Sequence, residues 1–131
     1  MSHAVVLDTS VLIAAMSPTD AHHESARSIL RRGAIGSVLH AHPMTIAETA
    51  VGASRLDRVD HLRNALRVLG VATVEIDDEH PWRLAYLRVR TGLPLPDCCV
   101  IFAAMSLEGH LATFDRRLRS AAERVGATVV E

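Results

Sequence analysis

The chain has 131 residues, of which 49% are hydrophobic and 22% charged, and its formal net charge is −1. This length and composition predict a single globular domain spanning 1–131, and no apolar run is long enough to cross a membrane. All 14 basic residues are arginine, which excludes functions that require a particular lysine, such as those of P-loop ATPases and protein kinases.

The first third of the chain predicts a buried strand followed by two helices. The uninterrupted apolar run at 4–7 is typical of a strand covered on both faces. Asp8 or one of the next two residues should cap a short helix whose body is 11–16. A second helix should start within 17–20 and end at Gly33. No basic segment precedes the first apolar run, so we expect no signal peptide and a cytoplasmic location.

The middle of the chain continues the alternation of strands and helices. The segment 37–41 predicts a strand, and 43–53 predicts a helix that begins with proline. Apolar residues recur with helical spacing from 58 to 69, and Gly70 should end that helix. The apolar and β-branched residues of 72–76 then predict another strand.

Two helices follow, the second of which should lie at the centre of the domain. The first should be capped within 77–78, carry a proline in its first turn and end at Gly92. The second, 94–105, is apolar almost all round, which is typical of a fully buried helix. Its adjacent cysteines, Cys98 and Cys99, are predicted to be buried thiols, because neighbouring cysteines rarely form a disulfide and two thiols do not make a zinc site.

The last elements complete an alternating pattern. Strands are predicted at 110–114 and 127–130, on either side of a helix at 115–125. Strands that alternate with helices predict an α/β fold. We expect a three-layer α/β/α sandwich with a central, mostly parallel sheet of four to five strands. In such sheets ligands bind beyond the carboxyl ends of the strands.

Four acidic residues are the candidate functional site. Asp8 and Asp115 each follow a predicted strand and Asp97 starts the buried helix, so each alone could be only a helix cap. Glu48 lies within a helix of small and apolar residues, where the alternative is a solvent-exposed face. Together, four carboxylates at one end of a sheet would need a cation, and an all-oxygen site suits Mg²⁺ or Mn²⁺. One or two such ions could activate water and stabilise the leaving oxygen at a phosphodiester.

Two hydroxyls are candidates for supporting this site. Ser10 lies two residues after Asp8, and Thr113 lies two residues before Asp115 on the same predicted strand. Either hydroxyl could hold a carboxylate, a water or a phosphate oxygen. Alternatively, Ser10 is only a helix cap and Thr113 is an ordinary strand residue with no role in the site.

Three arginines lie within four residues after Asp115. Arg116, Arg117 and Arg119 are candidate RNA-binding residues because arginine is the only strong phosphate-binding side chain in this sequence. Two divalent ions would add four positive charges and change the formal charge from −1 to +3, which favours nucleic-acid binding. The alternative is that these arginines belong to an ordinary solvated helix face.

The ordered set of motifs resembles the PIN domain. The matching pieces are VVLDTS at 5–10, Glu48, LPD at 95–97 and LATFD at 111–115. Ser10 matches the hydroxyl position beside the first acid of that family. By this resemblance, the family's four acidic residues correspond to Asp8, Glu48, Asp97 and Asp115.

Among PIN domains, a chain of this length is most similar to the VapC toxins of bacterial toxin–antitoxin pairs. The resemblance implies an endoribonuclease that depends on Mg²⁺ or Mn²⁺ and cuts structured RNA such as tRNA or rRNA. It also implies a homodimer that is held inactive by a VapB-like antitoxin. This narrower assignment rests on length and family analogy.

Other functions remain open from the sequence alone. The same acids could serve a metal-dependent phosphatase or a DNA nuclease, and a non-catalytic PIN scaffold could act only as a binding module. The eight histidines are predicted to be ordinary surface or interface residues. His40 and His42 share a strand face, but the spacing provides no third ligand for a metal.

Overall fold

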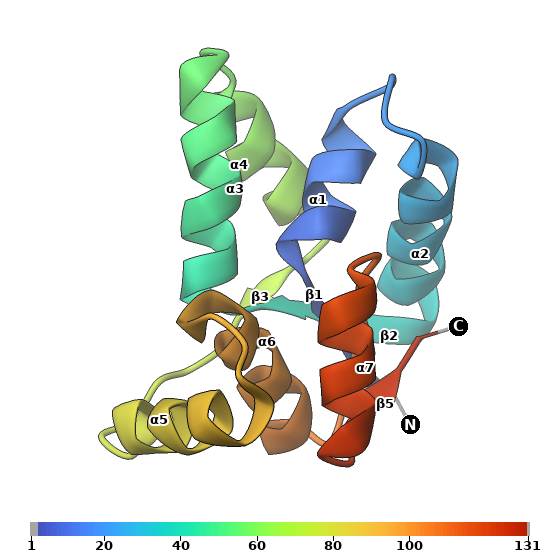
Figure 1. Cartoon of the computed structure of the whole chain (residues 1–131). Coiled ribbons are helices and arrows are strands. Elements are labelled where there is room, and N and C mark those ends of the chain that lie inside the picture. The colour runs from blue at the N-terminus through green and yellow to red at the C-terminus, as the bar shows by residue number, and fades with distance from the viewer. Residues whose placement is uncertain (1–2, 131) are drawn as a thin grey trace.

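The computed structural model describes residues 3–130 and shows a parallel sheet surrounded by helices (Figure 1). The strands are β1 (His3–Leu7), β2 (Ser37–Ala41), β3 (Ala72–Thr73), β4 (His110–Ala112) and β5 (Thr128–Val129). The helices are α1 (Thr9–Met16), α2 (His23–Gly36), α3 (Pro43–Arg55), α4 (Val59–Val68), α5 (His80–Thr91), α6 (Leu95–Ser106) and α7 (Arg116–Arg124). None of the helices within these residues is long and apolar enough to cross a membrane.

The sheet has the order β3-β2-β1-β4-β5, and every neighbouring pair is parallel. This confirms the predicted α/β fold with a central parallel sheet. β1 is the middle strand: Val5 pairs with Leu39 of β2 on one side and with His110 of β4 on the other. Because all strands run the same way, their carboxyl ends share one edge, and the segments that follow β1 and β4 are neighbours there.

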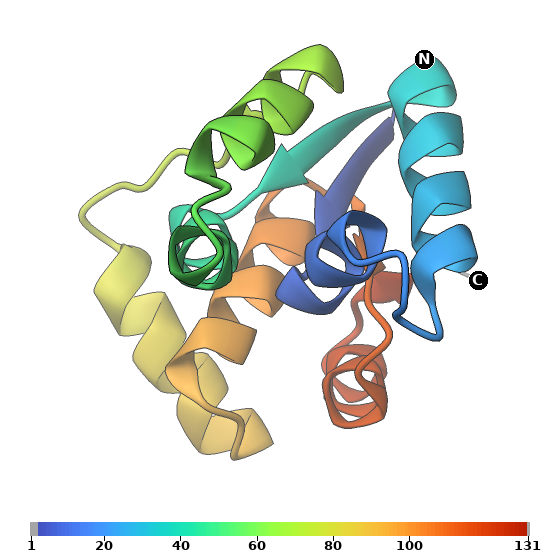
Figure 2. The same cartoon turned by 90° about the horizontal axis from the view of Figure 1, so that it is seen from above.

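The core lies on both faces of the sheet. Val6 faces a cluster formed with α5, α6 and α7, whereas Val5 and Leu7 face a cluster formed with α1 and α2. This alternation is the two-residue period of a strand buried on both sides. α6 is buried along 98–104, and Figure 2 shows it running beneath the sheet. The predictions of a central α6 and of buried thiols are therefore confirmed.

The second helix differs from its prediction at both ends. Residues 17–20 form a turn, in which the Asp20 amide donates to the Ser17 carbonyl, and α2 begins only at His23. The helix also continues through Gly33 to Gly36. A Cβ on Gly33 would lie 2.5 Å from Cδ2 of the buried Leu39. Gly33 therefore allows α2 to pack closely on β2 and does not end the helix.

The cap predicted within 77–78 is also wrong. The residue before α5 is Glu79, which makes no side-chain capping bond. The Asp77 carboxylate instead accepts the Glu79 amide within the preceding turn, at 3.0 Å. Gly92 does end α5, in the left-handed conformation at φ 72° that glycine adopts without strain.

Candidate functional site

The structure brings the four predicted acids to the carboxyl edge of the sheet. Asp8 follows β1 and Asp115 follows β4, and these segments are joined where the Asp8 amide donates to the Ala112 carbonyl at 3.0 Å. Asp97 lies in the first turn of α6. Glu48 lies within α3, on its solvent-exposed side. The charges of Asp8, Asp115 and Glu48 all act on Asp97, so the four carboxylates share one electrostatic environment.

Asp8 is fixed by two hydroxyls. Ser10 and Thr113 each donate to Asp8 Oδ2 at 2.7 Å, and Asp8 makes no side-chain capping bond to α1. The hydroxyls are themselves held by the backbone of the β4–α7 connection. The Phe114 amide donates to Ser10 Oγ and the Asp115 amide to Thr113 Oγ1, both at 3.0 Å. The two predicted supporting residues therefore link the segments that carry the first and last acids.

Thr113 acts from a different element than the one predicted. β4 ends at Ala112, so Thr113 lies in the connection to α7 and not on a strand face. Its hydroxyl is nevertheless buried, with 2% of the residue exposed.

The other carboxylates are positioned by their own elements. Asp115 caps α7, with Oδ1 accepting the amides of Arg117 and Leu118 at 2.9 and 3.2 Å. Glu48 Oε1 accepts a hydrogen bond from the Thr9 hydroxyl at 3.1 Å, which ties α3 to the start of α1. Asp97 has no capping role, because α6 begins two residues before it.

The surroundings of Asp97 raise the pKa of its carboxyl group. Burial, together with the charges of Asp8, Asp115 and Glu48, raises its pKa to about 6, against a lowering effect of Arg117. A carboxyl group that resists ionisation beside other carboxylates is typical of a site that a cation would stabilise.

The oxygens of these acids fit an all-oxygen cation site. Asp8, Asp115 and Glu48 each use one carboxylate oxygen for hydrogen bonds, and within 3–130 the other oxygen of each accepts none. These oxygens, with those of Asp97, could ligate Mg²⁺ or Mn²⁺. The acids do not form a tight ligand group: across the described residues, the three potential ligands lying within 4.8 Å of one another are not carboxylates. Carboxylates repel one another, so binding an ion would require them to move closer.

The three candidate RNA-binding arginines have different surroundings. Arg116 and Arg117 are exposed, and Arg117 is close enough to Asp97 to influence its pKa. Arg119 is half-buried and donates to the carbonyls of Thr113 and Val130 at 3.5 and 3.3 Å. Arg119 thus braces the backbone beside the site, and a role of Arg116 and Arg117 in RNA binding stays a prediction.

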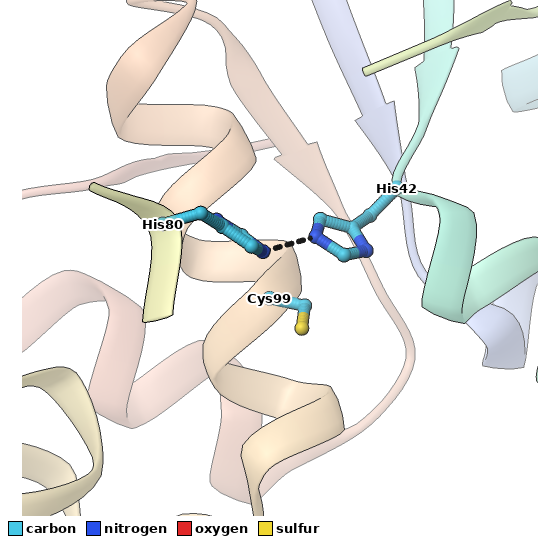
Figure 3. A group of neighbouring side chains, drawn as sticks. All are labelled: His42, His80 and Cys99. Carbon is cyan, nitrogen blue, oxygen red and sulfur yellow. Dashed lines mark hydrogen bonds between the residues drawn. The ribbon is translucent and has the colours of Figure 1, made fainter. Parts of the chain in front are cut away.

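A second polar cluster was not predicted from the sequence. His42, His80 and Cys99 are all buried, and their ligand atoms form the tight group, within 4.8 Å of one another. Figure 3 shows nitrogens of the two imidazole rings facing each other with the thiol beside them. The prediction of ordinary surface or interface histidines is wrong for these two. The positions of these residues in the sequence do not indicate a metal site, because the three residues lie on separate elements that only the fold brings together.

Burial keeps this cluster uncharged. It lowers the pKa of His42 to about 4, assisted by the charge of His80, and it lowers the pKa of His80 although Asp77 opposes the shift. Burial, together with the charges of Cys98 and Glu48, raises the pKa of Cys99 to about 11. The influence of Glu48 indicates that Cys99 lies near the acidic site.

Comparison with known families and structures agrees with this architecture. A family model described as PIN domain matches residues 5–124. No protein of curated function matches the chain significantly in sequence.

Several solved structures share the fold at low sequence identity. VapC20 of Mycobacterium tuberculosis, described as a sarcin–ricin loop cleaving toxin, superposes with a TM-score of 0.76 at 18% identity, covering 97% of this chain and 98% of that one. VapBC2 of Rickettsia felis, described as bound to a DNA fragment from their promoter, superposes with a TM-score of 0.72 at 15% identity. The match covers 98% of this chain and 97% of that one. FitAcB of Neisseria gonorrhoeae superposes with a TM-score of 0.67 at 18% identity, covering 97% of this chain and 96% of that one.

Proposed function

Because the chain belongs to the PIN-domain family, we propose that it is a Mg²⁺- or Mn²⁺-dependent endoribonuclease and the toxin of a VapBC-type toxin–antitoxin pair. The observation that carries the proposal is the shared electrostatic environment of Asp8, Glu48, Asp97 and Asp115 at the carboxyl edge of the sheet. The fold shared with VapC20 and VapBC2 supports the narrower choice of a toxin within the family.

The four acids would hold the metal, and a bound Mg²⁺ or Mn²⁺ would supply water activation and charge stabilisation at the phosphate. Ser10 and Thr113 keep Asp8 Oδ2 occupied, so that Oδ1 is the oxygen left for a ligand. The α7 amides do the same for Asp115 through Oδ1 and leave Oδ2. The protein thereby fixes one carboxylate oxygen of Asp8 and one of Asp115, and leaves the other oxygen of each for a ligand.

RNA is the proposed substrate, and its backbone would be held by Arg116 and Arg117. Both side chains are exposed at the start of α7, directly after Asp115. Guanidinium groups bind phosphate oxygens in bidentate geometry. They would place the backbone beside the carboxylates, and structured RNA such as tRNA or rRNA is the proposed target.

An antitoxin is the proposed partner, and the structure offers a groove that suits one. The groove, of about 510 Å³, lies between α1, α2 and α4. Its floor is apolar, with Leu12, Leu30 and Leu66 among its residues, and Arg27 and Arg31 contribute to its lining. An amphipathic helix with acidic flanks would complement it.

The assembly we propose for the free protein is a homodimer. α5 presents an exposed stripe formed by Trp82, Tyr86 and Val89. Large apolar side chains exposed together on one helix face are typical of an interface.

The direct test compares the native chain with Asp8→Asn on transcribed tRNA, an rRNA hairpin, single-stranded and duplex DNA, and a phosphate monoester. With Mg²⁺ we expect the native chain to cleave RNA and Asp8→Asn to lose that activity. The variant should keep its metal-free stability, because reduced charge repulsion offsets the weaker hydrogen bonds that a neutral amide accepts from Ser10 and Thr113. Mg²⁺ should raise the melting temperature of the native chain and raise that of Asp8→Asn less. Asp60→Asn, which changes an exposed carboxylate on α4, is the matched control and should behave like the native chain.

Different outcomes would support the alternatives. Cleavage of DNA or of the monoester, with RNA intact, would favour a DNA nuclease or a phosphatase. Mg²⁺ binding without any cleavage would favour a PIN scaffold that acts as a binding module. Equal Mg²⁺ effects on the melting of both proteins would place the metal elsewhere.

A further inference from the structure

We propose that His42, His80 and Cys99 form a second metal site, distinct from the acidic cluster, that binds Zn²⁺ or a closely similar ion. Two imidazoles and a thiol are ligands that Zn²⁺ prefers, whereas Mg²⁺ prefers the all-oxygen acidic site. The inference does not depend on nuclease activity, because it concerns other side chains and another class of ion.

The three side chains are already gathered for one ion. Their ligand atoms lie within 4.8 Å of one another, and the two Nε2 atoms are 2.9 Å apart. Ligands around Zn²⁺ at bond lengths of about 2.0–2.3 Å are separated by roughly 3.3–3.7 Å. The imidazoles would therefore move apart slightly and the thiol would move inward. Each residue is at most 5% exposed, so the site is shielded from bulk water.

The hydrogen bonds of the metal-free cluster leave one polar group unsatisfied. His42 Nδ1 accepts the Met44 amide at 2.9 Å, so the proton of this neutral ring is on Nε2, which donates to His80 Nε2. The proton of His80 must then be on Nδ1, a buried atom with no hydrogen-bond partner in the described part of the chain. The fold thus accepts the cost of one unpaired polar atom at this pair. This tautomer already suits His80 for a metal, because a neutral imidazole that ligates through Nε2 carries its proton on Nδ1.

Metal binding would replace this arrangement by three coordinate bonds. Zn²⁺ would displace the thiol proton of Cys99, which is released to solvent, and the proton of His42 would move from Nε2 to Nδ1. That move breaks the hydrogen bond from the Met44 amide. One neutral hydrogen bond contributes far less than the binding of Zn²⁺ by three ligands that are already close together, so the exchange favours the metal. A water molecule would complete a tetrahedral shell.

The site would join by coordinate bonds three segments that the metal-free protein holds together by packing and by the His42–His80 hydrogen bond. His42 is the N-cap of α3, His80 is the first residue of α5, and Cys99 lies within α6. α3 carries Glu48 and α6 carries Asp97. A Zn²⁺ ion there would hold the two helices that supply half of the acidic cluster, which makes its role structural.

The test is to refold the chain without metal in the presence of one equivalent of Co²⁺ and to record its absorption spectrum. Refolding gives the ion access to ligands that are buried in the folded protein. We expect a thiolate-to-cobalt charge-transfer band that saturates at one equivalent and disappears when Zn²⁺ is added. We also expect Zn²⁺ to raise the melting temperature.

Variants separate this site from other sources of the signal. Cys98→Ala is the matched control, since it removes the neighbouring buried thiol, and it should keep both the band and the stabilisation, as should Asp8→Asn. Cys99→Ala and His80→Ala should lose both. A band that survives in Cys99→Ala would overturn the proposal. If Cys99→Ala does not fold, X-ray absorption of the native chain with one equivalent of Zn²⁺ decides: a shell without sulfur overturns the site.

Discussion

The fold opposes the ionisation of Asp97. Its folded pKa of about 6 lies above the unfolded value of 3.8, so the folded protein holds the proton more tightly. The stability from this protonated group is fully present below pH 3.8 and is lost as the pH rises through about 6. At neutral pH, the ionised Asp97 therefore lowers the free energy of unfolding of the metal-free chain.

This sign predicts the behaviour of Asp97→Asn. Without metal, the variant should be more stable than the native chain at pH 7, by on the order of 1–2 kcal/mol after allowance for solvent screening. The two should differ little at pH 3.5, where the native acid is protonated. Denaturant unfolding in EDTA at both pH values measures the difference. A variant that is less stable than the native chain at pH 7 would contradict the charge argument.

The individual residues also show what a sequence can predict about a site. Asp8 and Asp115 could be placed because each follows a strand, and parallel strands end at one edge of the sheet. Ser10 and Thr113 lie within two residues of these acids and were predicted with them. Cys99 lies inside an apolar segment, and His80 follows the acidic run 77–79. No local pattern in either place separates a potential metal ligand from an ordinary residue.

At the scale of elements, the sequence predicted where strands begin better than where they end. β4 ends at Ala112 because it pairs with Leu7, the last residue of β1. β3 likewise ends at Thr73, which pairs with Ala41 at the end of β2. The segments 74–76 and 113–114 have strand-like residues, but no partner strand continues beside them. The end of a strand thus depends on its neighbour, which lies far away in the sequence.

Two helical glycines with different surroundings give a prediction at this scale. Gly33→Ala should lower stability by about 1–3 kcal/mol, because the new methyl group would collide with Leu39, which is 1% exposed and cannot easily move. Gly52→Ala in α3 meets nothing within 4 Å and should raise stability by about 0.5–1 kcal/mol. Urea unfolding of both variants measures the contrast. If both variants changed the free energy of unfolding by the same amount, helix propensity alone would account for the effect, and the contact of Gly33 with Leu39 would have no influence.

At the scale of the whole molecule, the groove and the acidic edge together predict how a partner would inhibit the enzyme. α1 connects them: it begins directly after Asp8, and its residues Leu12 and Met16 line the groove. A partner helix in the groove could extend an arginine or lysine to the carboxylates. That cation would compete with Mg²⁺, so the apparent affinity should fall as Mg²⁺ rises.

The measurement is a titration of a co-purified partner at several Mg²⁺ concentrations while RNA cleavage is followed. Leu66→Glu in the groove should weaken binding at every Mg²⁺ concentration, and a change of the partner's cation to alanine should remove only the Mg²⁺ dependence. Metal-independent affinity, with cleavage continuing at saturation, would exclude this form of inhibition.

The central pairing of β1 with β4 has a consequence for the time at which the protein becomes active. Val5 lies beside His110 in the sheet, so a nascent chain that does not yet include β4 has no partner for one side of its middle strand. Contacts between such distant residues form slowly and late. Asp8 also receives its Thr113 hydrogen bond, and its neighbour Asp115, only at that stage. Until residues 110–115 have been made and have folded against β1, the acidic cluster therefore stays incomplete, and the activity proposed for it cannot begin.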